Sequence, residues 1–126
     1  MIPRMNWAAK LAATVLPSGS LRRASGGDVA ALPGYDEGAW WVQDAAAALP
    51  AKLLGDVKDK IVADLCAAPG GKTAQLAASG GRVIALDSSA QRLDRLKANL
   101  ARLKLEAECV TANAESWRPK DRLAFI

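Results

Sequence analysis

Short apolar runs alternate with amphipathic segments in the second half of the chain, and this alternation constrains the fold more than any other feature. The apolar runs at 61–65, 83–86 and 107–111 have the length of strands. Helices are expected between them, over 72–78 and 88–103. The order strand, helix, strand, helix, strand predicts a parallel sheet with right-handed crossovers, so the expected fold class is α/β.

The longer of these helices carries the clearest periodic signal. Its leucines recur at steps of 3, 4 and 3 residues, which places them on one face: Leu93, Leu96, Leu100 and Leu103. Ser88 or Ser89 can cap its start. The pair Gly80-Gly81 can end the shorter helix in the left-handed conformation.

The first part of the chain is less regular. Residues 17–38 are rich in Pro, Gly and Ser, a composition typical of turns and short extended pieces. Trp40 and Trp41 form an apolar cluster that suits core packing better than stacking on a base. A helix is expected over about 43–54, where Pro50 would kink or split it.

Composition excludes several classes of site. The chain has 126 residues and no histidine, so the commonest general base and the commonest metal ligand are missing, and no metal is expected. The two cysteines, Cys66 and Cys109, have no metal-site spacing. The net charge of +4 is compatible with RNA binding, but on charge alone a solvated helix face explains it better. With no apolar stretch of about 18 residues, a cytoplasmic protein without a membrane anchor is expected.

The segment DLCAAPGGKT, residues 64–73, follows the first expected strand and precedes a helix, which is typical of an anion or cofactor site. A nucleotide-binding P-loop would need glycine where Cys66 stands, and Pro69 removes a backbone N–H that could hold a phosphate. The dinucleotide fingerprint Gly-x-Gly-x-x-Gly does not fit either, because Gly70 and Gly71 are adjacent.

A third reading is a site for S-adenosylmethionine in a Rossmann-like methyltransferase. This cofactor has no phosphate, so the loop need only let the backbone come close, which glycine permits. Its ribose diol needs a carboxylate at the end of the second strand, and Asp87 stands there, 16 residues beyond Gly71.

Four segments together strengthen this reading: LPGYDEGAWWVQDAAAALPAKLL, VADLCAAPGGKTAQLA, VIALDSSAQRLDRLKANLARL and AECVTANAESW. Over roughly residues 15–118 the chain resembles the Sun/Fmu family of bacterial ribosomal RNA cytosine-5 methyltransferases. The string Cys-Ala-Ala-Pro-Gly-Gly-Lys is highly specific to that family. The resemblance implies a class I methyltransferase fold, S-adenosylmethionine as cofactor and RNA, in particular small-subunit ribosomal RNA, as substrate.

The resemblance also implies which residues bind the cofactor. Asp87 would accept hydrogen bonds from the ribose hydroxyls, and Asn113 stands where the family usually has an aspartate near the adenine amino group. For Asp64 the sequence itself leaves three roles open: it could orient the loop, face the amino end of the cofactor or be purely structural. The residues around the methionine and ribose would be Cys66, Ala67, Ala68, Pro69, Gly70, Gly71 and Lys72.

The family uses two cysteines, one of which attacks C6 of cytosine from an Asp-Ala-Pro-Cys segment after a fourth strand. This sequence ends at Ile126, before that segment, so a truncated domain of about three parallel strands is expected, with no catalytic residue of its own. Residues 36–126 would be the partial S-adenosylmethionine-binding domain, and residues 1–35 a linker or the tail of an RNA-binding region. The first strand would then expose an edge through which copies dimerise or aggregate.

The sequence therefore predicts a fragment of an RNA cytosine-5 methyltransferase, inactive by itself. Two other functions stay open. One is a non-catalytic module that holds the cofactor or RNA, and the other is a P-loop nucleotide-binding domain.

Overall fold

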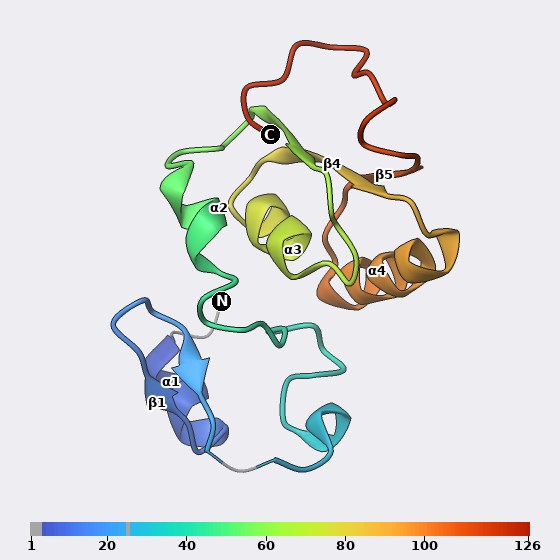
Figure 1. Cartoon of the computed structure of the whole chain (residues 1–126). Helices are drawn as coiled ribbons and strands as arrows, with labels where there is room; N and C mark the ends of the chain where they lie inside the picture. The colour runs from blue at the N-terminus through green and yellow to red at the C-terminus, as the bar shows by residue number, and fades with distance from the viewer. Residues whose placement is uncertain (1–3, 25) are drawn as a thin grey trace. The chain divides into compact units, whose positions relative to one another are not determined.

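The computed structural model describes residues 4–24 and 26–126, which fall into two compact units, Met1–Trp40 and Trp41–Ile126 (Figure 1). The first unit contains a short helix, a two-stranded antiparallel hairpin and a 3₁₀ turn. Their bounds are α1 Arg4–Lys10, β1 Thr14–Val15, β2 Leu21–Arg22 and η1 Val29–Ala31. The assignment of residues 1–35 to a linker or an RNA-binding region stays a prediction.

Trp40 packs within the first unit rather than presenting its ring as a stacking platform. Its indole Nε1 donates a hydrogen bond to the Pro33 carbonyl at 2.9 Å, and its ring meets that of Tyr35 edge to face with centroids 5.6 Å apart. Gly34 lies between Pro33 and Tyr35 in sequence. It is buried, and its φ is +86°. This backbone conformation favours glycine.

Replacing Gly34 by alanine is expected to lower the free energy of unfolding of the first unit by more than about 1 kcal/mol. The new Cβ would overlap the ring of Trp7, and the positive φ would add strain. Gly27→Ala is the matched control, because Gly27 has φ of +116° but open space around its Cβ position. Tryptophan fluorescence during urea unfolding measures the difference. Equal loss in both variants would show that strain alone, without the Trp7 contact, accounts for the effect.

The second unit is built on a three-stranded parallel sheet, which confirms the predicted α/β fold class. Its strands are β3 Ile61–Asp64, β4 Arg82–Asp87 and β5 Glu108–Thr111, in the order β3-β4-β5. Both neighbouring pairs are parallel. The carboxyl ends of all three strands therefore meet at one edge of the sheet.

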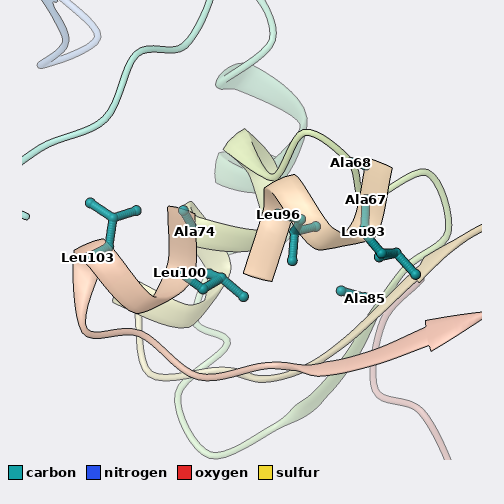
Figure 2. Packing of buried hydrophobic residues seen from close by; sticks show 8 residues of the cluster. All are labelled: Ala67, Ala68, Ala74, Ala85, Leu93, Leu96, Leu100 and Leu103. Atoms are coloured by element: carbon teal, nitrogen blue, oxygen red, sulfur yellow. The ribbon is translucent and has the colours of Figure 1, made fainter. Parts of the chain in front are cut away.

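Two helices cover one face of this sheet, α3 Gly71–Ala78 and α4 Ala90–Leu103. The four predicted leucines of α4 are all buried and form a cluster with alanines of α3, β4 and the loop after β3 (Figure 2). Ser89 caps α4 by accepting a hydrogen bond from Arg92 N at 3.3 Å. Helix α3 ends at Ala78, and Gly80 follows it in the predicted left-handed conformation, with φ of +87°.

The predicted helix over 43–54 is wrong in its first half. The helix there, α2, is confined to Leu49–Leu53. The Asp44 carboxylate accepts hydrogen bonds from the amides of Ala46 and Ala47, at 2.7 and 3.4 Å, and this folds the preceding alanines into turns. Pro50 lies in the first turn of α2, where its missing N–H costs no helical bond, so it starts a helix instead of kinking one.

The outer edge of β3 is partly paired, so the expectation of a bare edge is wrong for its first residues. Phe125 forms a parallel bridge with Val62. The Ala63 amide donates to the Phe125 carbonyl at 3.1 Å, and the Ala124 amide donates to the Ile61 carbonyl at 2.9 Å. The expected homodimer or aggregation through this edge has no support.

Candidate functional site

A pocket of about 230 Å³ lies at the carboxyl edge of the sheet. The loops after β3, β4 and β5 line it together with one residue of α4, which is the position where open α/β sheets bind ligands. Its volume is somewhat below the roughly 300–1,000 Å³ of most small-molecule sites, so it accommodates part of a nucleoside-sized ligand. The lining residues are Leu65, Cys66, Asp87, Ser88, Arg92, Ala112, Asn113 and Ala114.

Asp87, the last residue of β4, is the best-organised polar group of this pocket. It is 3% exposed, and both carboxylate oxygens accept backbone hydrogen bonds. Oδ1 accepts from Ser89 N at 3.0 Å, and Oδ2 accepts from Ala68 N at 3.3 Å. Buried carboxylates need such partners, and these two contacts hold the group at a fixed orientation.

Arg92 lies next to Asp87, because it occupies the first turn of α4. Its Nη1 is 3.4 Å from Oδ2 of Asp87, and its Nη2 donates to the Ala68 carbonyl at 2.6 Å. One guanidinium group therefore joins the end of β4 to the loop after β3.

Asp64, at the end of β3, orients the loop from inside. Its Oδ1 accepts from Cys66 N at 3.3 Å, and its Oδ2 accepts from the Thr73 hydroxyl at 2.8 Å. Thr73 is completely buried. The carboxylate thus bridges the start of the loop and the first turn of α3. This agrees with a role in orienting the loop, one of the roles that the sequence left open.

Two glycines stand where the loop enters α3, and the backbone conformation favours glycine at the first of them. Gly70 has φ of +115°, and a Cβ there would lie 3.1 Å from Cγ of Leu96. A Cβ on Gly71 would lie 3.2 Å from Cγ of Gln43. The loop is therefore packed closely on α4 on one side and on the segment around Gln43 on the other.

Gln43 ties its segment to α3. Its side chain accepts from Trp41 Nε1 at 3.0 Å and donates to Oε1 of Gln75 at 3.3 Å. Gln75 in turn donates to the Ala48 carbonyl at 2.8 Å. Trp41 packs against the leucine cluster, so its predicted role in the core is confirmed.

Three of the nine residues predicted to bind a cofactor line the pocket: Cys66, Asp87 and Asn113. The side chains of Ala67 and Ala68 are buried in the cluster with the leucines of α4. It is the backbone of Ala68 that contacts Asp87. Gly70, Gly71 and Lys72 lie at the start of α3, and Pro69 is exposed. The structure therefore brings together the two strand ends and Cys66, while the other six residues shape the loop.

The Asn113 side chain already has a local partner. Its Oδ1 accepts from Glu115 N at 3.0 Å, which forms a turn directly after β5. An amide oxygen has two lone pairs, so it keeps capacity for one further hydrogen bond toward the pocket.

The two cysteines have different environments. Cys66 is exposed at the pocket, whereas Cys109 lies in β5 and packs against the leucine cluster. Burial raises the pKa of the Cys109 thiol, and the positive charge of Lys97 offsets only part of this effect. Strand β4 lies between β3, which precedes the loop of Cys66, and β5, which contains Cys109.

Sequence reasoning missed Arg92, Thr73 and Gln43 as parts of the site. Arg92 lies off the leucine stripe of α4, so helical periodicity assigns it no role in a site. A usable signal was its place in the first turn of a helix that begins directly after Asp87, since side chains there lean back toward the preceding strand end. Within residues 4–24 and 26–126 there is no cluster of three metal-binding side chains, and none of the helices is long and apolar enough to cross a membrane.

Comparisons with known proteins point to one family. A family model described as 16S rRNA methyltransferase RsmB/F matches residues 51–123. The ribosomal RNA small subunit methyltransferase B of Vibrio vulnificus is 42% identical over 103 residues, covering 78% of this chain and 24% of that protein. Its counterpart in Shewanella oneidensis is 45% identical over 95 residues, covering 71% of this chain and 22% of that protein. The chain thus spans about a quarter of the length of the curated relatives it matches.

Solved structures show the same fold. A methyltransferase homolog protein from Pyrococcus horikoshii superimposes with a TM-score of 0.75 at 26% identity, covering 90% of this chain and 41% of that one. The crystal structure of NSun6 from Pyrococcus horikoshii with SFG gives a TM-score of 0.65 at 29% identity, covering 70% of this chain and 24% of that one.

Proposed function

The chain belongs to the 16S rRNA methyltransferase RsmB/F family, and from this premise we propose that it is the part of an RNA cytosine-5 methyltransferase that binds S-adenosylmethionine. Membership confirms the resemblance to the Sun/Fmu family, and it supports a methyltransferase as the general class of the protein. The cofactor, the cytosine-5 position and small-subunit ribosomal RNA as substrate are parts of the proposal. When bound, the cofactor supplies the methyl group.

The observation that carries this proposal is the Asp87 carboxylate at the carboxyl edge of the sheet. Its Oδ1 has few hydrogen-bond donors from the protein around it. Among the described residues, Oδ1 accepts one hydrogen bond, from Ser89 N, while Oδ2 meets both Ala68 N and Arg92. A carboxylate oxygen accepts more than one hydrogen bond. Oδ1 therefore has room for a ribose hydroxyl in the pocket that Asp87 lines.

The other predicted residues supply the walls. Cys66 and the backbone that follows it would lie along the methionine and ribose, and Asn113 would accept from the adenine amino group. Lys72 is half-buried in the first turn of α3 and outside the pocket lining, so its predicted contact with the cofactor has less support than that of Asp87. Residues 36–126 would form the cofactor-binding domain.

The geometry disfavours the P-loop alternative. A P-loop uses the hydroxyl after its lysine to bind Mg²⁺. Here that hydroxyl belongs to Thr73, which is completely buried and donates to Asp64. The loop therefore has no free hydroxyl for a metal–phosphate complex.

Calorimetry on the 126-residue chain tests the proposed cofactor. S-adenosylhomocysteine, which has the ribose and adenine of the cofactor without its methyl group, is expected to bind at least tenfold more tightly than ATP with Mg²⁺. Tighter binding of ATP would support the P-loop reading instead. Binding of neither ligand would leave the chain without the donor-binding role proposed for it.

A further prediction concerns the nucleophile of the methyl-transfer reaction. Attack on C6 of cytosine needs a thiolate placed against the base. Cys109 is partly buried against the leucine cluster, and this burial raises the pKa of its thiol, which lowers its thiolate fraction. Cys66 lies in the loop where the cofactor would sit. We therefore expect no methyl transfer from this chain alone.

A radiolabelled-methyl assay with unmodified small-subunit ribosomal RNA checks this expectation. The wild-type chain, Cys66→Ala and Cys109→Ala should all stay at the no-enzyme background. Incorporation by the wild type that either substitution removes would identify that thiol as catalytic and contradict the proposal.

A further inference from the structure

Arg92 lines the pocket and connects the loop after β3 to the end of β4. Its Nη2 donates to the Ala68 carbonyl at 2.6 Å, and its Nη1 lies 3.4 Å from Oδ2 of Asp87. The amide of the same Ala68 donates to that Oδ2 at 3.3 Å. These three contacts close a ring formed by one guanidinium, one carboxylate and the backbone N–H and C=O of Ala68.

The ring depends on the shape of a guanidinium group. Its nitrogens are held in a plane with fixed directions, so one side chain can serve a carboxylate and a carbonyl at the same time. A lysine ammonium in this place would retain the charge but present a single nitrogen. The arrangement therefore restrains two atoms at once, the Ala68 carbonyl and Oδ2 of Asp87.

The contact with Asp87 has more effect on geometry than on stability. The Arg92 side chain is 51% exposed, and ion pairs with an exposed partner contribute little to folding because solvent screens them. Asp87 itself is buried, and its Oδ2 is occupied by Ala68 and Arg92. Occupation of Oδ2 leaves Oδ1 as the oxygen that can accept a new hydrogen bond from a ligand.

We propose that Arg92 is a positioning residue for cofactor binding. It holds the Asp87 carboxylate and the loop at Ala68 in the arrangement that directs Oδ1 of Asp87 toward the ribose diol. This inference rests on the proposed function. It adds a residue that acts through Asp87, without a contact of its own to the adenine or the amino acid part of the cofactor. Its effect should therefore be restricted to ligands that carry the hydroxyl groups.

The test combines protein variants with two nucleosides. Arg92→Met keeps the length of the side chain and removes both contacts, and Arg92→Lys keeps the charge. Arg95→Met is the matched control, because Arg95 is an exposed arginine of the same helix outside the pocket lining. Affinities for adenosine and for 2′,3′-dideoxyadenosine are measured by NMR titration, after wild-type binding of S-adenosylhomocysteine has been established.

Arg92→Met is expected to weaken adenosine binding about tenfold, in line with the loss of a charge-assisted hydrogen-bonding arrangement. It should change the affinity for the dideoxy nucleoside less than about twofold, since Asp87 has no diol to bind there. Arg92→Lys should lie between the wild type and Arg92→Met, and Arg95→Met should match the wild type.

Equal losses for both nucleosides would show that Arg92 merely supports the loop, and unchanged adenosine affinity would show that it does not position Asp87; either result overturns the inference alone. A wild type that binds neither S-adenosylhomocysteine nor adenosine would overturn the proposed function together with this inference. The two failures are therefore distinguishable.

Discussion

Asp87→Ala is expected to weaken binding of S-adenosylhomocysteine by about 1–3 kcal/mol, which corresponds to about 5- to 150-fold in the dissociation constant. The substitution removes the acceptor proposed for the ribose diol. It also leaves the amides of Ala68 and Ser89 and the guanidinium of Arg92 without the carboxylate that they contact. Titration calorimetry measures the change, and circular dichroism shows whether the variant is folded.

Two further substitutions sharpen this result. Asp87→Asn is expected to lose nearly as much affinity as Asp87→Ala. Both oxygens accept backbone N–H groups, so the amide nitrogen of asparagine would have to face another donor. Asp94→Ala is the control, because Asp94 is an exposed acid on α4 outside the pocket lining. Equal dissociation constants for wild type and Asp87→Ala would remove Asp87 from the cofactor site.

Leu96→Ala is expected to lower the free energy of unfolding of the second unit by about 2–5 kcal/mol, the range for a buried leucine that leaves a cavity. Leu96 is completely buried at the centre of the leucine cluster (Figure 2). Leu53→Ala should change stability little, since Leu53 is 85% exposed on α2. Urea unfolding followed by circular dichroism compares the two variants.

A loss below about 1 kcal/mol in Leu96→Ala would contradict the packing of α4 described above. The same substitution should also loosen the loop after β3, because Gly70 packs so close to Leu96 that an added Cβ would lie 3.1 Å from its Cγ. Leu96 therefore belongs to the core of the domain and also lies against the loop at Gly70.

The parallel sheet and its two helices could be predicted because their signals are local. The leucine spacing of α4, the serine at its start and the glycines after α3 each report on a few neighbouring residues. The helix predicted over 43–54 failed for a related reason. Helical propensity of the alanines was outweighed by the Asp44 side chain, which binds the amides of Ala46 and Ala47 in a turn.

The parts of the site that could not be predicted depend on contacts between segments distant in sequence. The Arg92 contact with the Ala68 carbonyl spans 24 residues, and that of Gln43 with Gln75 spans 32. The bridge between Val62 and Phe125 joins β3 to the last residues of the chain. Helical or strand periodicity carries no information about such pairs, because they follow from how the elements pack. Asp87 was an exception, since the end of a strand is recognisable in the sequence and parallel strands bring their ends together.

The common direction of the three strands leaves the two edges of the sheet under different evolutionary constraints. The turns at 79–81 and 104–107 precede β4 and β5, so they lie at the edge away from the pocket. There the backbone needs particular conformations, as at Gly80 and Lys104, whose φ angles are +87° and +57°, and Gly80 also lies close to Lys58. Substitutions that keep these conformations and contacts should be tolerated in the turns, whereas residues at the carboxyl ends of the strands would have to bind the proposed ligand as well.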